Sequence, residues 1–165
     1  RLLMPRRYAR VLRAAREQDV GMRTHYRFDH SWHVGAAPDA VMALLEDVRG
    51  YGAWWPAVRV TGGSLREPRT ADLEVRAPLG YRLRITLTEQ ERRPGELRAA
   101  IGGELDGWSS WRVTPKGDGS RVDFAQEVEV RGRLLRAASP LLHGLFARQH
   151  AAVMRSAEHG MHAAV

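Results

Sequence analysis

The sequence predicts one α+β domain in which a strongly curved antiparallel sheet lies against a single long C-terminal helix. The prediction rests on seven candidate strands, on the short turns between most of them, and on a helical pattern over about residues 134–163. Strands joined by short turns must be antiparallel. A long helix beside such a sheet covers one of its faces. Because the sheet is curved, we expect a cavity between the sheet and the helix.

The first strand begins at Thr24, where apolar and polar residues alternate with period two as far as Val34. A helix is expected to start at Pro38-Asp39, because proline and an acid both suit a first helical turn. We expect this helix to end at Gly50. A second short helix or turn should follow, carrying Tyr51, Trp54, Trp55 and Pro56.

Six further candidate strands follow, separated by turns that contain glycine or proline. They are residues 58–66, 70–77, 81–91, 96–105, 108–114 and 121–131. The expected breaks include Gly62-Gly63, Asp106-Gly107 and residues 115–119. In the final helical segment, Pro140 should either kink the helix or mark its true start.

Residue parity sorts the strands into one dry face and one solvated face. The dry face is expected to hold Tyr26, Phe28, His30, Trp32, Leu73, Val75, Tyr81, Leu83, Ile85, Leu87, Leu97, Ala99, Ile101, Trp111, Val113, Val122, Phe124 and Val128. It also carries polar residues, namely His30, Ser109 and Gln126. The opposite face is rich in arginine and acids. The C-terminal helix supplies a matching apolar stripe, with His150 on or beside it and Gln149 next to it.

Composition excludes several classes of function. The chain has 165 residues, of which 44% are hydrophobic and 27% charged, as in an ordinary globular domain. It has no cysteine, which excludes disulfides, thiolate metal sites and thiol catalysis. No apolar run approaches the ~20 residues that span a bilayer. The first residues lack the apolar core of a signal peptide, so the default expectation is a cytoplasmic protein.

The net charge of +7 is concentrated near the N-terminus. Residues 1–22 contain six arginines against Glu17 and Asp19, which leaves the remainder only mildly basic. Bulk charge is therefore a weak indication of nucleic-acid binding, and we expect no nucleic-acid partner.

We divide the chain into a basic extension, residues 1–22, and a globular domain, residues 23–165. Within the extension, residues 4–16 have the pattern of a basic amphipathic helix, which could contact a membrane surface or a protein partner. The alternative is a poorly ordered extension, or sequence upstream of a true start at Met22.

Several segments together resemble a known family. They are VGAAPDAV at residues 34–41, Asp47-Val48, YGAWWP at residues 51–56 and HAAVM at residues 150–154, with residues 80–83 and 105–107 also in agreement. Over residues 24–163 the chain resembles the polyketide cyclase/dehydrase branch of the START/Bet v 1-like (SRPBCC) superfamily.

The resemblance implies a helix-grip fold, in which a seven-stranded antiparallel sheet wraps around the C-terminal helix and two small helices close it. Members of the superfamily bind hydrophobic or aromatic small molecules in the enclosed cavity. Some cyclise or aromatise polyketide chains, whereas others carry lipids, quinones or hormones. Fold alone therefore does not determine function.

The candidate ligand-binding residues combine aromatic and polar side chains expected near the cavity. They are Trp32, Trp54, Trp55, Tyr81, Trp111, Gln126, Phe146, His150 and Met154. For the tryptophans the alternative is a purely packing role, since aromatic residues dominate cores. Of the adjacent pair Trp54 and Trp55, we expect one to face inward and the other to pack elsewhere or lie near solvent.

Three residues are candidates for acid–base chemistry: His150, Tyr81 and His30. The alternative for His150 is a core histidine whose nitrogens are satisfied by a backbone carbonyl, Gln126 or Tyr81. No obvious acid–base pair is evident.

No cofactor or metal is expected. His143 and His150 are spaced to share one helical face, but no third ligand is evident. Neither Gly62-Gly63 nor Gly102-Gly103 is followed by a phosphate-loop pattern.

Three function hypotheses follow. The first, which we favour, is non-catalytic binding or transport of a hydrophobic small molecule such as a lipid, quinone or polyketide-like compound. The second is a polyketide cyclase, aromatase or dehydratase that uses cavity His and Tyr side chains. The third is an interaction module that uses residues 4–16. The ligand's identity and the oligomeric state stay open.

Overall fold

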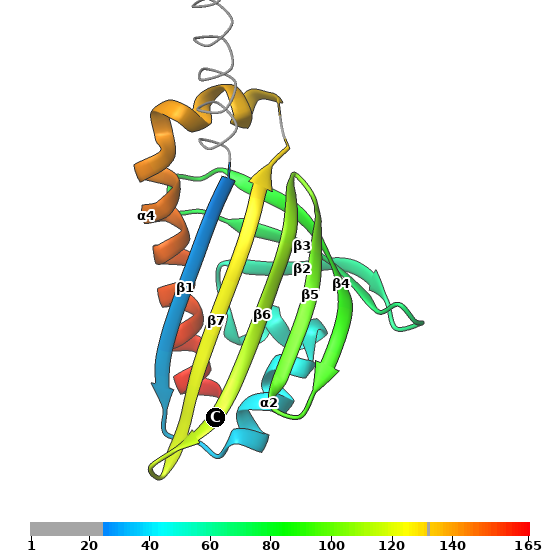
Figure 1. Ribbon diagram of the computed structural model, residues 1–165, viewed down its shortest axis with the longest axis vertical. Coiled ribbons are helices and arrows are strands. Elements are labelled where there is room, and N and C mark those ends of the chain that lie inside the picture. The colour runs from blue at the N-terminus through cyan, green and yellow to red at the C-terminus, as the bar shows by residue number, and fades with distance from the viewer. Residues whose placement is uncertain (1–24, 132) are drawn as a thin grey trace, which may run out of the picture.

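The computed structural model describes residues 25–131 and 133–165, with side chains of the last helix described from residue 144 onward. Within this range, seven antiparallel strands form one sheet (Figure 1). The elements are, in chain order, β1 (His25–Val34), α2 (Pro38–Glu46), the 3₁₀ helix η1 (Val48–Gly50), α3 (Tyr51–Trp54), β2 (Val58–Ser64), β3 (Thr70–Arg76), β4 (Arg82–Arg93), β5 (Glu96–Gly103), β6 (Leu105–Lys116), β7 (Gly119–Val130) and α4 (Arg133–Ala164).

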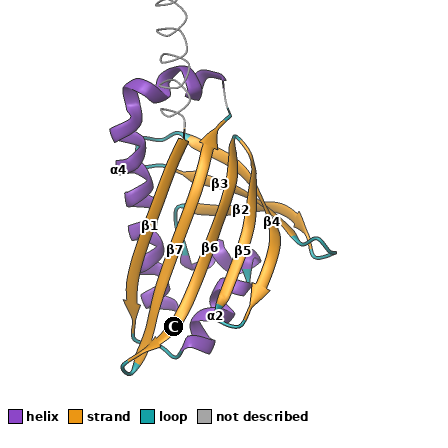
Figure 2. Cartoon of the chain, viewed as in Figure 1, coloured by secondary structure: helices purple, strands orange, loops and turns teal. Residues whose placement is uncertain are grey.

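The strand order is β1-β7-β6-β5-β4-β3-β2, so the first strand pairs with the last. Its register sets Tyr26 opposite Val128 and Phe28 opposite Gln126. The sheet curves, and α4 runs along one side of it while α2 lies at its lower end (Figure 2). The predicted fold class is confirmed, as a helix-grip arrangement of sheet and C-terminal helix. The predicted extension, including residues 4–16, lies outside the described residues.

One predicted strand break was wrong. We expected Asp106-Gly107 to interrupt the chain, but β6 is continuous from Leu105, and the turn lies at Gly103-Glu104 instead. Gly107 allows β6 and β7 to approach each other closely, because a Cβ at this position would come within 2.9 Å of Val128 Cα on β7. Similarly, Gly62-Gly63 lies inside β2, at a shift in its register with β3.

The helix boundaries also needed correction. The first helix starts at Pro38 as predicted, but it ends at Glu46 rather than Gly50. The Asp47 carboxylate then accepts a hydrogen bond from Gly50 N at 3.2 Å, which holds the separate 3₁₀ turn. Pro140 is not the start of the last helix, because α4 already begins at Arg133. The first turns of α4 lie at an angle to the rest of the helix (Figure 1), as expected where a proline removes a helical N–H.

The parity of the strands agrees with their burial. The inward side chains of β1, β3, β6 and β7 join one apolar core with α2, α3 and the C-terminal half of α4. Among the helix residues, Ala157 and Met161 are fully buried. The core therefore occupies the concave side of the sheet, where the helices cover it.

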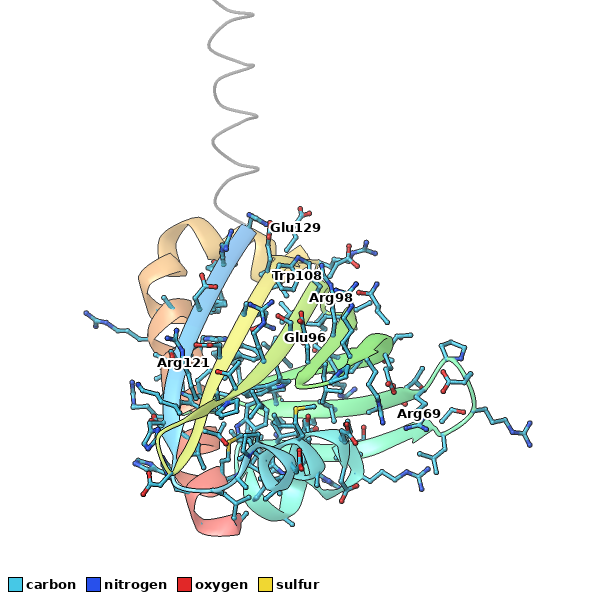
Figure 3. The ribbon with its side chains drawn as sticks, turned by 60° about the horizontal axis from the view of Figure 1, so that its bottom comes forward. Arg69, Glu96, Arg98, Trp108, Arg121 and Glu129 are labelled. Carbon is cyan, nitrogen blue, oxygen red and sulfur yellow. The ribbon has the colours of Figure 1, made fainter. Side chains whose placement is uncertain are left out.

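The convex face carries charge pairs (Figure 3). The Arg98 guanidinium lies 4.4 Å from the ring centroid of Trp108, and an Arg112 nitrogen lies 3.4 Å from a Glu96 oxygen. Glu74 is only 7% exposed on this face, because Arg76 and Arg82 cover it at 3.4 and 3.5 Å. Its charge is thus compensated by two guanidinium groups.

Ser120 ties the start of β7 to the loop before α2. Its side chain is fully buried and its hydroxyl donates a hydrogen bond of 2.6 Å to the Ala36 carbonyl. We expect Ser120→Ala to lower the free energy of unfolding by about 1–2 kcal/mol, because a buried carbonyl loses its donor. Urea denaturation measures this change. The control Ser110→Ala alters a serine on the convex side of β6 and should change stability by less than about 0.5 kcal/mol; equal losses in both variants would contradict the prediction.

Candidate ligand-binding site

An internal cavity of about 140 Å³ lies between the concave face of the sheet, α3 and α4. We call it the inner cavity. Its wall is overwhelmingly apolar, and the described residues that line it include no lysine, arginine, aspartate or glutamate. The polar side chains on the wall are Tyr26, Tyr51, Trp55, Tyr81, Ser109, Trp111, Gln126, Gln149 and His150. Such a wall suits a neutral ligand with a large apolar surface.

The structure brings most of the predicted site residues together at this cavity. Those on its wall are Trp55, Tyr81, Trp111, Gln126, Phe146, His150 and Met154. Three predicted residues, Trp32, Trp54 and His30, do not line it. Trp32 packs behind the wall on Trp111, with ring centroids 5.7 Å apart, and His30 lies behind His150.

The adjacent tryptophans face different ways. Trp55 lines the cavity, and its indole N–H donates a hydrogen bond of 3.1 Å to the Val153 carbonyl of α4. Trp54 is buried against α4 instead, and its indole nitrogen has no hydrogen-bond partner among the described residues. The two rings stack with centroids 5.6 Å apart. The pair thus joins α3 to α4 while contributing one ring to the wall.

A histidine–histidine–glutamine network crosses from β1 through α4 to β7. His30 Nε2 lies 3.4 Å from His150 Nδ1, and His150 Nε2 lies 2.8 Å from Gln126 Oε1. The His150 ring also stacks on Phe28, with centroids 3.6 Å apart and planes 7° apart. Both ring nitrogens of His150 therefore have protein partners.

The directions of these hydrogen bonds follow from the acceptor at their end. The carbonyl oxygen of Gln126 can only accept, so His150 Nε2 must carry a proton. In neutral imidazole Nδ1 is then the acceptor, and His30 Nε2–H donates to it. The chain runs from His30 to His150 to Gln126, which leaves the amide NH₂ of Gln126 free of this network.

Burial keeps His150 neutral. Desolvation, with a smaller contribution from neighbouring His30, lowers the pKa of His150 from 6.5 to about 3. Burial also lowers the pKa of His30, although the negative charges of Asp29 and Glu158 act to raise it. At neutral pH both imidazoles are therefore uncharged and fit the hydrogen-bond directions given above.

Tyr81 and Gln149 also line the inner cavity. Burial, and to a lesser extent Tyr26, raises the pKa of the half-buried Tyr81 phenol, which stays protonated at neutral pH. Gln149 is buried, and its side-chain oxygen accepts a hydrogen bond of 3.0 Å from the backbone N–H of Leu79. This bond attaches the β3–β4 turn to α4.

Several wall residues were not among the predicted ligand contacts. Phe28 and Ser109 were assigned to the dry face by parity alone, and Gln149 to a flank of the helical stripe. Because their parity already placed Phe28 and Ser109 on the dry face, these two could have been predicted as ligand contacts. Nothing in the sequence marked Tyr51, whose hydroxyl donates to the Leu45 carbonyl at 2.7 Å, as a wall residue.

A second cavity of about 150 Å³, the side cavity, lies between α2, η1, the start of α3 and strands β2–β6. It shares four wall residues with the inner cavity: Tyr51, Leu87, Ser109 and Trp111. Its wall carries charged side chains, including Glu46, Arg69, Glu89 and Arg92. The two cavities are thus neighbours across a thin partition.

No group of three or more potential metal ligands occurs among the residues that the structure describes. The side chain of His143, the predicted neighbour of His150, lies outside them. Within the same part of the chain, no helix has the length and apolar character needed to cross a bilayer.

Comparison with protein families now identifies the chain. The model of the family described as "polyketide cyclase / dehydrase and lipid transport" matches residues 25–158. The chain belongs to this family. No protein with a curated description matches the sequence. The expected resemblance is therefore confirmed for the greater part of the chain, although the family name spans both catalysis and transport.

Solved structures of similar proteins support the fold. Protein TTHA0849 from Thermus thermophilus superposes with a TM-score of 0.72 at 19% identity, covering 84% of this chain and 96% of that one. The Zhui aromatase/cyclase from Streptomyces sp. R1128 superposes with a TM-score of 0.64 at 16% identity, covering 85% of this chain and 93% of that one. A START superfamily protein from Mycobacterium smegmatis superposes with a TM-score of 0.59 at 14% identity, covering 78% of this chain and 93% of that one. At these identities the likeness shows the helix-grip fold alone.

Proposed function

We propose that this member of the polyketide cyclase/dehydrase and lipid transport family binds and carries a neutral hydrophobic small molecule in the inner cavity. The observation that carries the proposal is an apolar cavity whose described wall has no charged side chain. In addition, both nitrogens of His150 on this described wall are engaged by protein groups. The described part of the wall thus offers apolar surface rather than a free acid–base pair.

The cavity is large enough for such a role. An apolar cavity of about 150 Å³ holds a benzene ring, so the inner cavity fits a ligand portion of about that size. Burying about 300 Å² of apolar ligand surface contributes about 7 kcal/mol before the cost of association. Before that cost, about 7 kcal/mol corresponds to a Kd of about 10 μM, so apolar burial alone supports weak binding without a covalent or ionic contact.

Filling the inner cavity tests the proposal. Leu83 is half-buried on β4 and lines the inner cavity. We expect Leu83→Trp to weaken binding of the neutral apolar probe toluene at least about tenfold, because the larger ring occupies the ligand's space. NMR titration measures the affinity. Native mass spectrometry of the purified protein should also detect a co-purifying apolar molecule, with less of it in the variant.

A matched control is Leu97→Trp. Leu97 is also a half-buried leucine on the dry face, but it lines the side cavity only. This variant should keep the affinity of the wild type. No probe binding by the wild type, or the same loss in both variants, would contradict binding in the inner cavity.

A cyclase, aromatase or dehydratase is the second candidate, favoured by the phenol of Tyr81 at the cavity wall. A protonated phenol can donate to a reacting carbonyl, with His150 and His30 as the further candidates. The test is turnover of a poly-β-keto thioester followed by mass spectrometry. Catalysis by Tyr81 would be supported by a loss of about a hundredfold in kcat for Tyr81→Phe with binding intact. Absence of turnover in the wild type would count against this candidate.

A further inference from the structure

A hollow on the outer surface lies where the free edge of β2 meets η1 and α3. We call it the arginine hollow. Its volume is about 420 Å³, and one arginine from each of η1, β2 and β3 lines it, namely Arg49, Arg59 and Arg76. The described wall contains no aspartate or glutamate, and its other residues are small or apolar. The hollow therefore gathers positive charge without an acid on its wall.

Two of these three arginines are free to bind an anion. Arg49 and Arg59 are exposed, and neither has an ion-pair partner among the residues that the structure describes. Arginines elsewhere on the sheet are paired, as Arg121 is with Asp123 at 2.9 Å. Cations that converge without matching acids create a local positive potential, which attracts anions.

Two acids in the neighbourhood are already engaged. The Asp47 carboxylate accepts a backbone hydrogen bond within its own turn. Glu74 lies directly opposite Arg59 in the strand register. It is held by Arg76 at 3.4 Å and by Arg82 at 3.5 Å. The four arginines of this region thus outnumber these two acids by two, so a doubly charged anion would balance the excess.

The backbone adds a donor at the same place. Arg76 N donates to the Ala57 carbonyl at 2.8 Å, and hydrogen-bonded pairs alternate with non-bonded pairs along an antiparallel ladder. Val60, three residues after Ala57, therefore falls at a non-bonded position. Because β2 is an edge strand, the Val60 N–H is directed to its free edge, where Val60 lines the hollow.

The charge and the donors of the hollow favour a phosphate group. A guanidinium presents parallel N–H donors that match two oxygens of a phosphate or a carboxylate. A carboxylate carries one negative charge, whereas a phosphate monoester carries about 1.5 to 2 at neutral pH. The α3 side of the hollow also leaves room, because a Cβ at Gly52 would meet only the Val58 carbonyl oxygen, at 3.6 Å.

We propose that the arginine hollow binds the phosphate group of an anionic ligand, a phosphate monoester or a diphosphate, through Arg49, Arg59 and Arg76. The phosphate can belong to a soluble compound or to a lipid headgroup, since the hollow recognises the same chemistry in both. The site lies outside the inner cavity, so this inference goes beyond the proposed binding function and does not depend on it.

Calorimetric titration of the full chain with pyrophosphate tests the site. Because residues 1–22 are also basic, the readout is the difference between variants rather than binding as such. We expect Arg59→Gln to weaken pyrophosphate binding about tenfold, the size of one charge-assisted hydrogen bond. The matched control is Arg66→Gln. It removes an exposed arginine that is unpaired among the described residues and does not line the hollow, and it should change the affinity less than about twofold.

A second pair of variants adds a charge instead of removing one. Ala53→Glu introduces a carboxylate from an exposed position of α3 on the wall of the hollow, and it should weaken pyrophosphate binding at least about tenfold. Ala43→Glu adds the same charge at an exposed position of α2 outside the hollow, and it should leave the affinity unchanged. This comparison also serves if Arg59→Gln fails to fold. In the wild type, the amide NMR signals of Gly52 and Val60 should shift during the titration.

Vesicles identify the source of the phosphate. Cosedimentation with phosphatidylcholine vesicles that contain phosphatidic acid, reduced in Arg59→Gln but not in Arg66→Gln, supports the site and assigns the phosphate to a lipid headgroup. The same contrast with pyrophosphate alone supports it and assigns the phosphate to a soluble compound. Equal effects of the two arginine variants, or unshifted Gly52 and Val60 signals, overturn the inference. Toluene titration of the same samples reports on the inner cavity, so failure of the proposed function is seen separately.

Discussion

Lowering the pH from 6.5 to 3 should reduce the free energy of unfolding by about 4 kcal/mol through His150 alone. In the folded protein the pKa of this imidazole is lowered from 6.5 to about 3, mainly by burial. Between these values the unfolded chain binds a proton that the folded chain does not. The stabilisation is therefore complete above pH 6.5 and is lost progressively as the pH falls toward 3.

Urea denaturation at a series of pH values measures this dependence. Burial also lowers the pKa of His30, which adds a loss in the same direction. The contribution of His150 is isolated by His150→Gln, which keeps a hydrogen-bonding side chain but cannot titrate. We expect this variant to lose markedly less stability on acidification than the wild type.

His33→Gln is the matched control, since it replaces an exposed histidine on the same strand as His30. It should leave the acid sensitivity of the wild type unchanged. An equal pH dependence in the wild type and in His150→Gln would show that protonation of His150 does not govern acid unfolding.

Gly160→Ala should lower the free energy of unfolding by about 3 kcal/mol. At Gly160, helix α4 approaches α3 so closely that a Cβ would overlap the carbonyl oxygen of Trp54 and come within 2.7 Å of its carbonyl carbon. Both obstacles are backbone atoms, so no side chain can rotate out of the way. Relief requires α3 and α4 to move apart, which would also disturb the hydrogen bond from Trp55 to Val153.

Gly144→Ala is the control within the same helix. Nothing lies within 4 Å of a Cβ at this exposed position. Because alanine has the higher helix propensity, this variant should be as stable as the wild type or more stable by about 0.5–1 kcal/mol. Thermal unfolding of both variants measures the contrast. Similar stabilities for the two would contradict the close contact between α3 and α4.

The sequence was most informative where one strand face is dry and the other solvated. Alternation along β1 and β7 was enough to place Tyr26, Phe28 and Gln126 on the side that faces α4. The sequence pattern gave a wrong prediction where a glycine can serve either as a turn residue or as a point of close contact between strands. Gly107 looked like a turn residue, yet it allows close contact between two paired strands, which no local pattern can indicate.

The candidate site was only partly predictable for a similar reason. A stripe on α4 indicated that His150 faces the sheet, but its two hydrogen-bond partners come from β1 and β7. Those partners depend on the strand register, and on the wrapping of the sheet that brings the first strand beside the last. The sequence alone therefore left a ligand contact and a satisfied core histidine as open alternatives for His150.

The pairing of the first strand with the last also has a consequence for folding. His30 and His150 are in contact although 120 residues separate them in the chain, and β1 pairs with β7 along its whole length. Contacts of such long sequence separation require closure of a large loop, which makes folding slow. During synthesis β1 has no strand partner until β7 has left the ribosome, and the wall that contains Phe28, Gln126 and His150 can be completed only after α4 follows. The candidate site is thus among the last parts of the protein to form.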